Sequence, residues 1–145
     1  MPEKRTIERA RRDAREGKAP TTQAGEFVRE EMEHIREGKH GARSTKQAIA
    51  IGLSKARRAG VPLPPPKEGR TSERTRRQAE RDLTKGQSGA KNAKPSAKRS
   101  RAVTGALKRE GRGAASKAAL SRQARTAAQQ RRKRGKVTAA QSHLT

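Results

Sequence analysis

The chain lacks cysteine, tryptophan and tyrosine, and Phe27 is its only aromatic residue. Without cysteine it can form neither a disulfide nor a thiolate metal site, which fits a reducing cytoplasm. With one aromatic side chain, recognition of single-stranded RNA by base stacking is disfavoured. No apolar run approaches the roughly 20 residues of a membrane-spanning helix, and the N-terminus is too charged for a secretory signal. We therefore expect a cytoplasmic protein with no membrane association.

Apolar side chains are also scarce, because hydrophobic residues make up only 28% of the 145 residues. The large ones gather most densely in residues 26–63. Each contributes roughly 1.5 to 3 kcal/mol when fully buried, against an ordering cost of about 1.5 kcal/mol per residue. Such a core is too small for a catalytic pocket, so we expect no enzyme and no cofactor. We expect a marginal mini-domain that a partner, a dimer or a polyanion stabilises.

Acidic residues are outnumbered by basic ones, since 38 Lys and Arg against 14 Asp and Glu leave a net charge of +24. The excess is concentrated in residues 96–145, which carry fourteen basic residues and one acidic residue. Self-repulsion of this size opposes compaction. The sequence therefore presupposes a polyanion, of which nucleic acid is the commonest large one.

Two helices are predicted in the apolar stretch. The later one begins at Thr45, because Ser44 and Gln47 form an S-x-x-Q capping box, and Gly60 ends it. The earlier one is capped by Thr22 and runs to about Glu37. Apolar residues recur at three- and four-residue spacing in both helices: Val28, Met32, Ile35, Ala48, Ile49, Leu53 and Ala56. The short connection between them predicts an antiparallel helical hairpin.

The fold class is therefore mostly α, in four segments. Residues 1–21 are a charged N-terminal segment with a candidate helix over residues 3–16. This helix is either surrounded by solvent or packs a narrow apolar stripe on the hairpin through Ile7, Ala10 and Ala14. Residues 22–66 are the hairpin mini-domain with a proline-rich end. Residues 67–95 hold a charged helix over 72–85 and a linker. Residues 96–145 form a long basic tail, largely disordered or helical only on binding a polyanion.

One cluster of side chains is a candidate metal site. His34 and His40 lie six residues apart, with Glu30 and Glu37 nearby. The spacing matches no recognised ligand pattern, so solvent-facing side chains are the preferred interpretation and no metal is expected. Residues 38–41 resemble a phosphate-binding turn only loosely. With Arg43 and the N-terminus of the following helix, they are the best anion site of the ordered region.

Phosphate contacts are expected from the loop between the two helices and from the tail. Deleting residues 96–145 is expected to remove most of the affinity and to leave the hairpin folded. The predicted nucleic-acid-binding residues are Lys39, Arg43, Lys98, Arg99, Arg101, Lys108, Arg109, Arg112, Lys117, Arg122, Arg125, Arg131, Arg132, Lys133, Arg134 and Lys136.

The central motif also carries a resemblance. The run KQAIAIGLSKARRAG follows GKHGARST and EFVREEMEHIRE. It resembles an uncharacterised family of short, strongly basic bacterial proteins with a K-Q-A-I-A-I-x-L-S-x-A core. This resemblance implies a bacterial cytoplasmic protein that binds DNA. Alanine is common in that family at the position of Gly52 and glutamate at that of Lys55, which implies a looser and more basic helix here. The run KPSAKRSRA is similar in composition to linker-histone tails.

The sequence thus favours low-specificity nucleic-acid binding, to DNA more than RNA, by a nucleoid-associated or compacting protein. A protein-interaction adaptor with an electrostatic anchor tail and an RNA- or ribosome-associated factor stay open as alternatives. The hairpin is expected to form a homodimer or to dock a partner helix. The reason is that four apolar side chains need more cover than two helices supply: Phe27, Ile51, Val61 and Leu63.

Overall fold

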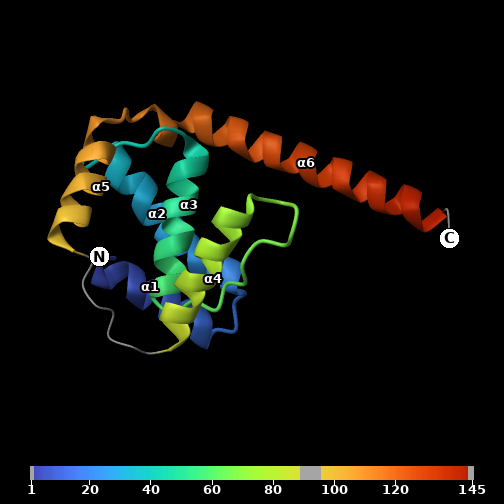
Figure 1. Ribbon diagram of the computed structural model, residues 1–145, viewed down its shortest axis with the longest axis horizontal. Coiled ribbons are helices and arrows are strands. Elements are labelled where there is room, and N and C mark those ends of the chain that lie inside the picture. The colour runs from blue at the N-terminus through green and yellow to red at the C-terminus, as the bar shows by residue number, and fades with distance from the viewer. Residues whose placement is uncertain (1, 89–95, 144–145) are drawn as a thin grey trace.

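A computed structural model describes residues 2–88 and 96–143, with side chains described as far as Lys136. The described chain is mostly α and contains no strand (Figure 1). Six α-helices and one short 3₁₀ helix follow one another in the order α1 (Lys4–Arg15), α2 (Pro20–Arg36), α3 (Thr45–Arg58), α4 (Glu73–Gln87), α5 (Ala97–Arg109), η1 (Gly113–Ala115) and α6 (Lys117–His143).

Helix α3 begins at Thr45, where the capping box predicts. The Ser44 Oγ accepts a hydrogen bond of 3.1 Å from the Gln47 N–H. The Gln47 side chain reaches one residue further back than expected and accepts from the Arg43 N–H at 2.6 Å. Two N–H groups near the helix start are thereby satisfied, which fixes both the start of α3 and the path of the chain that enters it.

Helix α2 begins at Pro20, so the prediction of a Thr22 cap was wrong. Ala19 is the N-cap, and the Thr22 N–H donates to the Ala19 carbonyl at 3.0 Å within the first turn. Proline suits the first helical position because its ring presets φ and its missing N–H has no helical partner there. The helix ends as predicted, and Gly38 follows it with a φ of +78°.

Helices α2 and α3 pack against each other at very short range (Figure 1). A Cβ atom on Gly52 would lie 2.7 Å from the Val28 Cα and 2.9 Å from its Cγ2. Gly52 is therefore the point of closest approach between the helices, and its role is packing, where the sequence implied a looser helix. Lys55, the other departure from the family pattern, forms an ion pair with Glu31 of α2.

Helix α1 covers one side of α2. Ala10 is buried in a cluster with Phe27, Val61 and Leu63, and Ile7 packs against the same cluster. The expected apolar stripe is thus present through Ile7 and Ala10. Ala14 is exposed, and Thr6 and Asp13 are the other buried positions of the helix. The apolar side chains Phe27, Ile51, Val61 and Leu63 led us to expect a partner. The chain itself buries three of them, Phe27, Val61 and Leu63.

Helix α4 packs on α3 through a polar contact that the sequence does not reveal. The buried Asp82 accepts hydrogen bonds from the Ser54 Oγ at 2.7 Å and from the Gln78 Nε2 at 3.1 Å. The Arg58 Nε lies 3.7 Å from the same carboxylate. A buried carboxylate must be paired, so these contacts fix the register of α4 on α3. Most of the expected linker, residues 86–95, lies outside the described residues.

The tail is helical over α5 and α6, where the sequence predicts disorder or helix formation on binding. Between these helices, η1 enters the core. Ala114 and Ala115 are buried with Met32, Ile35 and Ala48. Backbone carbonyls hold η1 in place, because Ala114 accepts from the Thr45 Oγ1 at 2.5 Å and Ala115 from the Arg36 Nε at 3.0 Å. Part of the tail is therefore part of the fold.

This packing changes what truncation should do. Deleting residues 96–145 is expected to lower the free energy of unfolding by about 3 kcal/mol, because it uncovers Ile35 and Met32 and removes the two hydrogen bonds to η1. Deleting only residues 129–145 should change it by less than about 0.5 kcal/mol. Urea denaturation followed by circular dichroism measures both. Equal stability of the two truncated proteins would contradict the role of η1.

Candidate nucleic-acid interface

Helix α6 extends away from the other helices (Figure 1). In the described part of the chain it contacts only η1 and α3. Its 27 residues span about 40 Å at 1.5 Å per residue. Most of its length is therefore open to a partner.

Five basic residues line one side of α6. Their spacing of three, seven, one and three residues places them on one helical face. All five are exposed, and we call them the basic stripe: Arg122, Arg125, Arg132, Lys133 and Lys136. The stripe covers about 21 Å of helix axis. The other predicted residues of the distal helix, Arg131 and Arg134, lie on other faces.

A basic hollow of about 360 Å³ lies between α3 and α6, at one end of the stripe. Arg43, Lys46 and Arg122 line it together with Ser44 and Thr45 at the N-terminus of α3. The partial positive charge of that helix end adds to the three cations. Arg43 was predicted for this role, whereas Lys46 was missed, although its place in the first turn of a capped helix was a usable signal.

A second basic hollow, of about 410 Å³, borders the other end of η1. Its lining includes Arg36, Arg112 and Lys117. Arg112 and Lys117 were predicted as site residues, and Arg36 was not. Arg36 comes from the last turn of α2 and reaches this place because it donates to the Ala115 carbonyl. The two hollows lie on either side of η1. This short helix therefore separates the basic residues of one hollow from those of the other.

Lys39 does not join this surface. Its Nζ lies 3.2 Å from a Glu37 oxygen and 3.6 Å from a Glu3 oxygen. The hydrogen bond to Glu37, with smaller contributions from Glu3, raises the pKa of Lys39 above its ordinary value. These acidic neighbours offset part of the Lys39 charge within the chain, and an anion site shared by Lys39 and Arg43 stays a prediction.

The turn that contains Lys39 holds the tail by its backbone. The Gly41 N–H donates to the Leu107 carbonyl at 2.8 Å, and the Ala42 N–H donates to the Gly111 carbonyl at 3.1 Å. A Cβ on Gly41 would lie 2.0 Å from the Glu110 carbonyl oxygen, so only glycine fits. The Gly41 and Ala42 N–H groups are therefore engaged within the chain and are not free to donate to a phosphate.

The predicted residues of α5 are exposed and spread around the helix: Lys98, Arg99, Arg101, Lys108 and Arg109. Helix α5 has no buried residue and touches no other helix in the described part of the chain. Only its C-terminal end is fixed, through the backbone bonds to Gly41 and Ala42. These cations extend the basic surface without forming a hollow.

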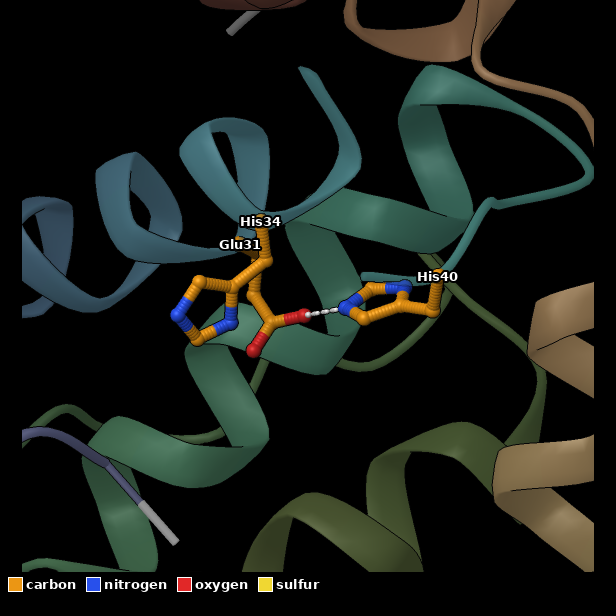
Figure 2. Close-up of side chains that lie close together, drawn as sticks. All are labelled: Glu31, His34 and His40. Carbon is orange, nitrogen blue, oxygen red and sulfur yellow. Dashed lines mark ion pairs between the residues drawn. The ribbon is translucent and has the colours of Figure 1, made fainter. Parts of the chain in front are cut away.

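The histidines are not the solvent-facing side chains that we expected. The His34 and His40 side chains are 15% and 14% exposed. They lie on either side of the Glu31 carboxylate, which is completely buried (Figure 2).

Glu30 is also buried, and its Oε1 accepts from the Glu3 N–H at 2.7 Å. The hydrogen bond from His34, followed by smaller effects of Lys39 and Arg5, lowers the pKa of Glu3. Glutamates in a charged helix gave no sign of burial in the sequence.

Comparison with known protein families matches the N-terminal part of the chain. Residues 3–67 match a family of unknown function (DUF6496). No curated protein and no solved structure matches the chain. In the described residues, no helix is long and apolar enough to cross a membrane. The chain is thus similar to this family over α1, α2 and α3, while α4, α5, η1 and α6 lie outside the match.

Proposed function

We propose that this protein binds duplex DNA with low sequence specificity, through the basic stripe of α6 and the two hollows beside η1. The observation that carries the proposal is the segregation of charge. Thirteen of the fourteen acidic residues lie at or before Asp82. Many of them pair with basic residues of neighbouring elements within the α1–α4 part of the chain. In the described residues between Ala97 and Lys133, no basic side chain forms an ion pair with a carboxylate.

Basic side chains without acidic partners, at this density, favour binding of a polyanion. Each Lys or Arg that neutralises a phosphate releases a condensed counterion, and this release provides most of the affinity in non-specific binding. An isolated helix about 10 to 12 Å across fits the major groove, which is about 12 Å wide. Helix α6 has this freedom, because it contacts other elements only near its start.

Low specificity follows from the residue types. Phosphate contacts by Lys and Arg set position and orientation, whereas sequence is read by hydrogen bonds to base edges. The stripe contains only Lys and Arg, and the chain has no aromatic side chain available for stacking on bases. Such binding suits a bacterial protein that associates with the nucleoid or compacts DNA. In this proposal the bundle of α1 to α4 orients α6.

Neutralising the basic stripe tests the proposal. A variant with glutamine at Arg122, Arg125, Arg132, Lys133 and Lys136 should bind duplex DNA more weakly, and the slope of log affinity against log salt should fall by about 4. Fluorescence anisotropy with a labelled duplex measures both quantities.

A matched control removes the same charge from the bundle. Its five glutamine replacements are at exposed basic residues of α1 and α4: Lys4, Arg11, Arg12, Arg74 and Arg77. The control should keep most of the affinity and of the salt slope. If both variants lose affinity equally, the interface is not on α6.

The two alternative functions are outcomes of a second experiment. Co-purification from lysate with and without nuclease separates nucleic-acid binding from a protein adaptor, because a protein partner survives nuclease treatment. Competition between duplex DNA and duplex RNA then separates DNA binding from a ribosome-associated role. Sedimentation tests the further proposal that the α2–α3 pair forms a homodimer or binds a partner helix. Phe27, Val61 and Leu63, three of the apolar side chains on which that proposal was based, are buried within the chain.

A further inference from the structure

Three side chains of α2 and the turn after it converge on one point. Figure 2 shows His34 and His40 approaching the Glu31 carboxylate from opposite sides. One ligand atom from each of the three residues lies within 4.8 Å of the other two. The ring centroids of the histidines are 6.2 Å apart, and the rings are nearly perpendicular.

The hydrogen bond of His40 fixes its tautomer. Its Nδ1 lies 2.9 Å from the Gly41 carbonyl oxygen. Because a carbonyl oxygen only accepts, Nδ1 carries the hydrogen and donates it. In the neutral ring, Nε2 then has no hydrogen and carries a lone pair. This nitrogen lies 3.2 Å from the Glu31 Oε2. Two lone pairs therefore face each other, and a cation between them would satisfy both.

The contacts of His34 lead to the same result. Its Nε2 lies 3.1 Å from the Glu3 Oε1 and 3.8 Å from the Glu30 Oε1. An ionised carboxylate only accepts, so Nε2 carries the hydrogen of the neutral ring, and Nδ1 is the lone pair left to bind. A carboxylate on one ring nitrogen is the usual partner of a histidine whose other nitrogen holds a metal.

Glu31 completes the set. Its side chain is fully buried, and Oε1 pairs with the Lys55 Nζ. Its Oε2 is buried with no hydrogen-bond partner. Leaving such an oxygen unsatisfied costs free energy, because the group has lost its water. This fully buried oxygen faces the His40 Nε2 (Figure 2), which distinguishes the cluster from an exposed group of acidic residues.

We propose that Glu31 Oε2, His34 Nδ1 and His40 Nε2 bind a divalent transition-metal ion of the zinc class. Two imidazoles and one carboxylate are a ligand set that Zn²⁺ accepts, with water in the fourth position. Ca²⁺ and Mg²⁺ prefer six or more oxygen ligands, so the two imidazole nitrogens of this set disfavour them. Ligand atoms bonded to zinc at about 2.0 to 2.2 Å lie roughly 3.4 Å apart in a tetrahedron. The ligand atoms of this cluster lie within 4.8 Å of one another, so metal binding would draw them closer.

Such an ion would fasten the interhelical turn to α2. His40 precedes Gly41 and Ala42, whose N–H groups hold the end of α5. Metal binding would therefore stabilise the turn on which the tail is anchored, a structural role independent of whether α6 binds DNA.

Zinc titration of the full-length, chelator-treated protein tests this site. With zinc chloride at 100 times its dissociation constant, Tm should rise by about 5 to 10 °C. The His34→Gln and His40→Gln variants should lose this rise. The matched control is His143→Gln, which removes the third histidine of the chain and should respond as the wild type does.

A second measurement does not depend on the variants folding. Co²⁺ bound by two imidazoles and a carboxylate with water should give the visible absorption of a tetrahedral complex, displaced by one equivalent of Zn²⁺. A Tm that zinc leaves unchanged, or a Co²⁺ spectrum equal to that of the hydrated ion, would overturn the proposal. An equal zinc response in the wild type and both ligand variants would overturn it as well.

Discussion

The affinity of this protein for duplex DNA is expected to fall by roughly 10³ to 10⁵ as salt rises from 50 to 200 mM. The size of the effect follows from neutralisation of about eight phosphates, each of which releases condensed counterions. The basic stripe and the two hollows together hold ten cations, which is enough to neutralise that number of phosphates. Phe27 is the only aromatic residue and is buried, so stacking on bases cannot replace the electrostatic contribution at high salt.

Anisotropy titrations at four or five salt concentrations measure this slope. Duplexes of unrelated sequence and equal length should give the same slope and similar affinities, because phosphate contacts carry no sequence information. A flat salt response would contradict the electrostatic proposal. A steep response with one preferred sequence would instead point to base contacts from α6.

The helices that the sequence predicted well are those with strong local signals. Ser44 and Gln47 mark the start of α3, and Gly38 marks the end of α2, because caps depend on only a few neighbouring residues. The apolar spacing also identified the contact faces, although among the predicted apolar residues of α3 only Ala48 and Ala56 are fully buried, and Ile49 and Leu53 are partly buried. Alanine is buried there because the helices approach closely.

The features that the sequence missed depend on residues far apart in the chain. Burial of Glu31 requires Lys55 and His40 around it, and no spacing rule relates these three residues. Similarly, Ala114 and Ala115 look like any alanines of a basic tail. They are buried because Thr45 and Arg36 bind their carbonyls. The sequence therefore predicted the basic residues of α6. It did not predict that η1, just before α6, packs into the core.

Replacing Gly52 with valine is expected to lower the free energy of unfolding by about 3 kcal/mol, the upper end of the usual cost of overpacking. The new Cβ would lie 2.7 Å from a backbone atom of Val28, which no rotamer change can move away. The two helices would have to separate along their contact. That separation would weaken the packing of Met32, Ile35 and Ala48 beside it.

The same substitution at Gly25 is the matched control. Gly25 lies in α2 with no atom within 4 Å of the added Cβ, so only helix propensity changes there. Valine is slightly better than glycine in a helix, and stability should rise by a few tenths of a kcal/mol. Urea denaturation with an unchanged slope measures both variants. Because backbone entropy changes alike at the two sites, a difference in sign isolates the steric cost at the α2–α3 contact. Equal effects at Gly52 and Gly25 would mean that the helices do not approach as closely as the geometry requires.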